Sequence, residues 1–169
     1  MLAQLGFYWG VFGVVYILGQ TIGKLYSYVA ELPFAELQVH HWIFVVFYTA
    51  FMAYAEGYKG FQKKFSPRII ARSLYLKNNL TPIRFVLAPF FCIGYFHGTK
   101  KRLITSYCIT AFIAILVLIV KVTPQPWRGM IDLGVIVGLS WGVIAILCFL
   151  FVYLKNKKFD VSPETPDQP

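Results

Sequence analysis

The sequence predicts an all-α integral membrane protein with four transmembrane helices. Hydrophobic residues make up 58% of the chain and charged residues 14%, whereas soluble domains carry about 25% charged residues. Four apolar runs of about 18–25 residues are each long enough, as helices, to cross a hydrocarbon core of about 30 Å. The 16 Lys and Arg residues are distributed unevenly between the segments that join these runs. Backbone groups in lipid must satisfy one another, so the runs are expected to be helical.

The first two runs, residues 5–26 and 39–56, are separated by a short acidic connector. No basic region precedes the first run, so it is expected to be a retained span and not a cleaved signal peptide. The second run is rich in aromatic residues, which favour membrane interfaces. The N-terminus is then expected on the cytoplasmic side and the connector outside.

The stretch 57–102 is basic and is predicted to be a long cytoplasmic loop. Ser66 followed by Pro67 is a typical helix start. It predicts a basic amphipathic helix over about 67–77 that lies at the membrane surface. Basic residues here would contact anionic headgroups or an acidic partner. The residues expected to do so are Lys63, Lys64, Arg68 and Arg72.

Within this loop, residues 82–97 are apolar but would form a helix only about 24 Å long. Pro89 interrupts the segment, and Lys or Arg residues flank both of its ends. A full crossing would leave one basic flank outside, against the positive-inside rule. We therefore predict a re-entrant or interfacial helix that returns to the cytoplasmic side.

The last two spans are predicted over residues 103–122 and 130–154, so that residues 1–158 form a single membrane domain. The loop then carries ten Lys or Arg residues and the C-terminal flank three, against three on the outer side. This bias predicts that both termini face the cytoplasm, with a bacterial inner membrane as the location. Residues 159–169 contain three prolines and few apolar residues, which predicts a disordered tail.

Glycines four residues apart give the clearest packing signal. Small residues at this spacing let two membrane helices approach closely. Two interpretations stay open: packing among the protein's own helices, or an interface with a partner membrane protein or a second copy of the chain. The glycines concerned are Gly134, Gly138 and Gly142 in the fourth span and Gly19 and Gly23 in the first.

Two sets of ionisable residues are candidates for a polar site. Glu56 ends the second span and Arg84 begins the apolar loop segment. They suit either a polar path beside a re-entrant helix or interfacial ion pairs. His40, His41 and Asp132 fall at the predicted outer face. They would suit a metal or proton-transfer site, although adjacent histidines point about 100° apart on a helix, and Asp132 also suits a helix cap.

Catalytic, cofactor and metal-binding signatures are absent from the sequence. The three cysteines lie in separate apolar segments without a C-x-x-C pair, which indicates packing residues. The net charge of +9 is explained by basic membrane loops, and no nucleic-acid module accompanies it.

These observations favour a non-enzymatic accessory or scaffold subunit of a membrane assembly, which contacts anionic lipid and a membrane partner. One alternative is a small transporter or lipid-handling protein that uses Glu56 and Arg84. The other is a membrane enzyme with an outer-face His/Asp site.

Overall fold

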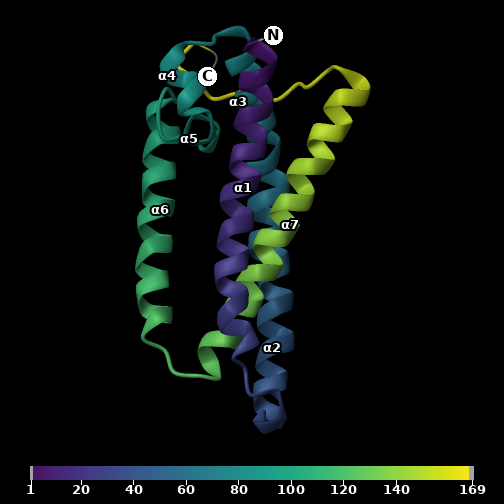
Figure 1. Ribbon diagram of the computed structural model, residues 1–169, viewed down its shortest axis with the longest axis vertical. Helices are drawn as coiled ribbons and strands as arrows, with labels where there is room; N and C mark the ends of the chain where they lie inside the picture. The colour runs from purple at the N-terminus through teal and green to yellow at the C-terminus, as the bar shows by residue number, and fades with distance from the viewer. Residues whose placement is uncertain (1, 168–169) are drawn as a thin grey trace.

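The computed structural model describes residues 2–167, which form helices and connecting segments without strands. Figure 1 shows an elongated bundle with both ends of the chain at one end. α1 runs away from that end, a long helical rod returns to it, α6 runs away again and α7 returns. The elements are α1 (Leu2–Ala30), η1 (Phe34–Glu36), α2 (Val39–Met52), η2 (Ala53–Phe65), α3 (Ser66–Asn78), α4 (Pro82–Val86), α5 (Ala88–Ile93), α6 (Lys100–Lys121) and α7 (Trp127–Asn156).

Three helices within residues 2–167 are long and apolar enough to cross a membrane, namely α1, α6 and α7. Their lengths and compositions confirm the prediction of an all-helical, multi-pass membrane protein. They correspond to the first, third and fourth predicted spans. The second predicted span is built differently.

This second span is the first part of a longer helical rod formed by α2, η2 and α3. Ala53 and Ser66, where one element passes into the next, both have right-handed helical backbone angles, so the rod continues unbroken. Its central part, η2, is a π-helix, in which hydrogen bonds join residues five apart. Residues 57–65, the first part of the stretch expected to be a basic loop, are therefore helical and continue the second predicted span.

The π-helical winding brings residues five apart onto the face of the rod that meets α7. A Cβ atom built on Gly57 would lie 2.9 Å from the Trp141 ring. Gln62, five residues later, accepts a hydrogen bond of 2.8 Å from the Trp141 indole nitrogen. Reasoning from the 3.6-residue period of an α-helix cannot anticipate this spacing.

α7 packs against the rod along its glycine row. A Cβ atom at Gly134 would lie 2.5 Å from Tyr48, and one at Gly142 would lie 2.5 Å from Phe61. These separations leave no room for a side chain, so the close approach requires glycine. The structure therefore supports the first interpretation of this row, packing between the protein's own helices.

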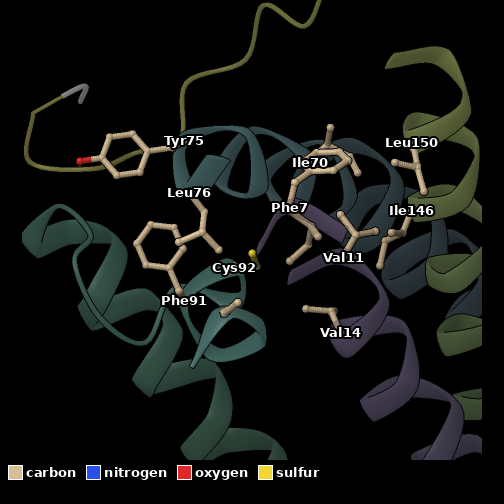
Figure 2. Close-up of a cluster of buried hydrophobic side chains, with 12 residues drawn as sticks. Phe7, Val11, Val14, Ile70, Tyr75, Leu76, Phe91, Cys92, Ile146 and Leu150 are labelled. Carbon is tan, nitrogen blue, oxygen red and sulfur yellow. The ribbon is translucent and has the colours of Figure 1, made fainter. Parts of the chain in front are cut away.

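α3 is enclosed at the end of the bundle where both chain ends lie. Figure 2 shows Ile70 and Leu76 of α3 among buried side chains that come from α1, α5 and α7. Burial of this apolar surface stabilises the fold by about 25 cal/mol per Å². α3 thus differs from the predicted helix on the membrane surface, because neighbouring helices cover its isoleucine and leucine side chains.

The apolar segment 82–97 folds as two short helices. Thr81 caps α4, its Oγ1 accepting a hydrogen bond of 3.3 Å from the N–H of Arg84. Leu87 separates α4 from α5. Gly94 ends α5 at a φ of +100°, a left-handed conformation that glycine adopts without strain. α5 packs against α1 and α3, near the start of α6 (Figure 1).

α6 is attached to the rest of the chain at its two ends. Tyr107 and Thr110 hydrogen bond to Tyr95, but residues 107–119 are all exposed, so the rest of the described chain buries no face of this part of α6. Figure 1 shows α6 standing apart from α1 along most of its length. Near its start, Arg102 Nη2 donates to the Ile93 carbonyl oxygen at 2.7 Å. Beyond its end, Gln125 Nε2 donates to the Tyr28 carbonyl oxygen at 3.0 Å.

Candidate functional site

Charged residues divide unequally between the two ends of the bundle. The end that holds η1 and the connection between α6 and α7 has three basic residues, Lys24, Lys121 and Arg128, and three acidic residues, Glu31, Glu36 and Asp132. The rest of the chain carries thirteen Lys or Arg residues against four Asp or Glu, which accounts for the whole net charge of +9. We call the end with the chain termini, α3, α4 and α5 the basic end.

Arg72 is the buried centre of the basic end, with 0% of its surface exposed. Its Nε donates to the Phe91 carbonyl oxygen at 2.7 Å, its Nη1 to that of Pro163 at 2.9 Å and its Nη2 to that of Phe96 at 2.9 Å. Burial lowers the pKa of Arg72 to about 10, so the side chain stays charged at neutral pH. Arg72 therefore joins α3, the segment around α5 and the C-terminal tail. Full burial corrects the expectation that Arg72 contacts lipid headgroups.

The C-terminal tail places a carboxylate between two further arginines. Glu164 Oε2 lies 3.2 Å from Arg68 Nε and 3.8 Å from Arg102 Nε. The Glu164 carbonyl oxygen also accepts a hydrogen bond of 3.0 Å from the N–H of Thr99, just before α6. The tail up to residue 167 thus packs on the bundle, whereas its composition predicted disorder. The difference arises because its acidic groups meet arginines that are distant in the sequence.

A second tail carboxylate, Asp167, lies at the rim of the basic end. Tyr75 Oη donates to Asp167 Oδ2 at 2.7 Å, and His97 Nε2 lies 3.5 Å from the same oxygen. The hydrogen bond from Tyr75, together with the nearby His97 and Arg84, holds the pKa of Asp167 below its usual value. Arg84 Nη2 is itself 3.1 Å from His97 Nε2. Arg84, expected beside a polar path, is therefore part of this rim.

Three of the residues expected to contact lipid headgroups remain accessible, namely Lys63, Lys64 and Arg68. The two lysines are exposed at the junction of η2 and α3, and Lys63 Nζ lies 4.6 Å from the centre of the Tyr58 ring. The Arg68 side chain keeps 17% of its surface exposed beside Glu164.

The structure does not bring Glu56 and Arg84 together. Glu56 lies on η2 against α7, where a Cβ atom built on Gly138 would be 2.7 Å from Glu56 Oε2. This oxygen is buried and has no hydrogen-bond partner within residues 2–167. The close packing around Glu56 gives no support to a polar path through this point.

His40, His41 and Asp132 also have separate partners. The two imidazole rings lie 3.9 Å apart, and the His41 ring is 5.3 Å from the Trp127 ring. Asp132 Oδ2 is 3.9 Å from Arg128 Nε, four residues earlier on α7. Among the residues that the structure describes, no three His, Cys, Asp or Glu side chains are grouped to hold a metal ion.

α1 carries exposed polar and small residues on and beside the face that meets α5. A Cβ atom at Gly13 would fall against Pro89 of α5. Gln20, seven residues later, lies on the same face of α1, beyond α5, and is exposed. Gly19 and Gly23 are exposed next to it, and no atom of residues 2–167 lies within 4 Å of a Cβ built on either, apart from their own surroundings in α1.

Sequence reasoning missed His97, Arg102, Glu164 and Asp167 as members of the basic end. A signal for the two acidic residues exists: the segments that form the basic end are otherwise strongly basic, and opposite charges attract over several ångströms. No protein-family model, curated protein or solved structure matches this chain.

Proposed function

We propose that the protein is a non-enzymatic accessory or scaffold subunit of a membrane assembly, and that a transmembrane helix of a partner protein packs between α1 and α6. The observation that carries this proposal is the exposure of residues 107–119 on every face of α6. Because α6 is held at both ends and not along its length, its side facing α1 is open to a further helix.

The polar side of α1 favours a protein helix over lipid as the occupant. Gln20 lies well inside α1, ten residues from its C-terminal end, and its amide is exposed. An amide in hydrocarbon lacks the hydrogen bonds that water provides, and a neighbouring helix with a polar side chain supplies them. Gly19 and Gly23 let such a helix approach the α1 backbone closely.

The proposal includes four crossings of a bacterial inner membrane, with the first part of the rod, residues 39–56, as the second crossing. Alternating directions of α1, the rod, α6 and α7 support this topology (Figure 1), and thirteen basic residues favour a cytoplasmic location of the basic end. Segment 82–97 is then re-entrant or interfacial, since it starts and ends at the basic end. Lys63 and Lys64 contact anionic headgroups there.

Photocrosslinking tests whether a partner helix contacts the side of α6 that faces α1. Benzoylphenylalanine at Ile113 is expected to form a protein adduct in native membranes, because Ile113 lies seven residues after Ser106, on the face towards Gly94 and α5. The matched position is Ile115, which is also exposed but points about 200° away on the helix. It is expected to give lipid adducts alone.

Lipid adducts alone at both positions would overturn the proposal, as would equal protein adducts at both. A leucine at Gln20 is expected to reduce the Ile113 adduct, since it removes the amide that a partner helix would hydrogen bond. Tests with Gly138→Leu cannot address the partner, because Gly138 already packs against Glu56.

A further inference from the structure

The tail lies over a site that has more positive charge than the tail neutralises. Arg68 and Arg102 share one carboxylate oxygen of Glu164. Arg72, one helical turn after Arg68, donates to neutral carbonyl groups. Two exposed lysines, Lys100 and Lys101, begin α6. Two guanidinium groups therefore share one carboxylate oxygen, and the guanidinium of Arg72 has neutral carbonyl groups as its hydrogen-bond acceptors.

Polar atoms beneath the tail lack partners. Arg102 has 7% of its surface exposed and Ser106 has 5%. Arg102 Nε and Ser106 Oγ are buried without a hydrogen-bond partner within residues 2–167, and Glu164 Oε2 is 3.8 Å from Arg102 Nε, beyond hydrogen-bond distance. Buried donors are nearly always paired in folded proteins. The unpaired Arg102 Nε therefore points to an acceptor that fits better than the Glu164 carboxylate.

The tail contains a residue in an unfavourable backbone conformation, and its side chain is partly exposed. Glu164 has a φ of +52°, a left-handed conformation that is unfavourable for a non-glycine residue. Its side chain keeps 37% of its surface exposed, so a soluble or headgroup anion can reach the same arginines. The α6 N-terminus starts beside it, and the helix dipole favours a negative charge there.

We propose that Arg68, Arg102 and the N-terminus of α6 form a binding site for a phosphate group, and that the tail covers this site with Glu164 in place of the phosphate. A phosphate carries more charge than a carboxylate, and its several oxygens can accept from both guanidinium groups at once. The phosphate belongs either to a lipid headgroup or to a soluble compound, and both compete with the tail.

Binding of inorganic phosphate to the full-length protein in detergent tests the site. Glu164→Gln removes the competing charge and is expected to tighten binding about tenfold, a difference of about 1.4 kcal/mol. Arg68→Gln is expected to weaken binding about tenfold, and Arg68 is partly exposed, so the fold should tolerate it. Lys59→Gln is the matched control, since it removes the same charge from an exposed position of the rod away from the tail.

Equal weakening by Arg68→Gln and Lys59→Gln would overturn the site, because it would show attraction to general surface charge. An unchanged affinity in Glu164→Gln would overturn the covering role of the tail. A spin label at Val161→Cys, in a protein with Cys108→Ser and Cys148→Ser, is expected to become more mobile as phosphate binds. Phosphate binding with unchanged label mobility would contradict displacement of the tail.

Nanodiscs identify the source of the phosphate. Tail release in discs with phosphatidic acid, but not in discs of phosphatidylcholine alone or with inorganic phosphate, identifies a lipid headgroup. Release by inorganic phosphate in phosphatidylcholine discs identifies a soluble compound. The absence of release and of saturable binding under all three conditions would refute the proposal.

Discussion

At the scale of single residues, the buried guanidinium of Arg72 organises the basic end. A charge without exposed surface is costly to bury unless its donors are paired. Here the carbonyl groups that accept from Arg72 come from two segments of the chain, the one around α5 and the C-terminal tail. Hydrogen bonds to a charged group contribute about 1.5–3 kcal/mol each, more than bonds between neutral groups. Arg72 is therefore expected to fix the positions of α5 and the tail relative to α3.

Replacing Arg72 with methionine is expected to destabilise the protein by about 3 kcal/mol or more, because several buried carbonyl groups lose their donor. Lysine should recover only part of this loss, since its ammonium group lacks the planar fork of donors. Thermal unfolding in detergent measures the effect. Lys64→Met, at an exposed position of the same rod, serves as the control. A melting temperature of Arg72→Met equal to that of Lys64→Met would contradict this role.

The pair of Tyr75 and Asp167 makes docking of the tail depend on pH. The pKa of Asp167 is lower in the folded protein than its usual value of 3.8. Its contribution to docking is therefore fully present above pH 3.8 and is lost as the pH falls through the lowered pKa. Tyr75→Phe removes the largest cause of the shift and should raise the pKa of Asp167. Carboxyl-carbon NMR titration follows this directly, with Tyr54→Phe as the control. An equal pKa of Asp167 in both variants would show that the hydrogen bond from Tyr75 is not the cause of the lowered pKa.

At the scale of elements, α7 and the π-helical part of the rod fit each other through glycines. Gly134, Gly138 and Gly142 meet side chains of the rod at distances that exclude a Cβ atom. A helix with small residues along one face allows close backbone approach, which supplies the van der Waals contacts that hold membrane helices together. Gly19 and Gly23 have the same spacing on α1 but face open space within the described chain.

The glycine row of α7 and the glycine pair of α1 are expected to respond differently to leucine. Gly138→Leu should destabilise the protein by about 1–3 kcal/mol, because the new side chain meets Glu56. Gly23→Leu should leave thermal stability unchanged and reduce recovery of the partner after gentle detergent extraction. Melting temperature and native-gel migration of both variants separate these effects. Loss of stability in Gly23→Leu, or full partner recovery, would contradict the roles assigned to α1.

At the scale of the whole molecule, the orientation that we propose rests on the uneven charge distribution. The end with the termini has nearly all of the excess positive charge, and such charge stays on the cytoplasmic side during insertion. The contacts of the tail with Arg68 and Tyr75 also require residues 68–84 and 162–167 to share one side. Topology and tertiary contacts therefore agree.

Labelling with a membrane-impermeant maleimide tests this orientation. In a protein with Cys108→Ala and Cys148→Ala, cysteines at Asn79 and Asp160 should react from the cytoplasmic side. A cysteine at Thr123, in the connection between α6 and α7, should react from the opposite side, because α6 separates these points by a full crossing. Reaction of Asn79 and Asp160 from opposite sides would refute four crossings.

The sequence by itself determined the helical class, the multi-pass character and the concentration of positive charge in one set of connecting segments. These properties follow from hydropathy and charge summed along the chain, so they need no knowledge of which segments meet. Only the tertiary structure decided that residues 57–65 continue the rod, that Arg72 is buried and that the tail packs on arginines. Each depends on partners distant in sequence: Trp141 for the π-helical face, carbonyl groups around α5 for Arg72, and Arg102 for Glu164. Local composition predicted a loop, an accessible arginine and a disordered tail instead. The contacts that stabilise these segments form only when distant parts of the chain come together in the fold.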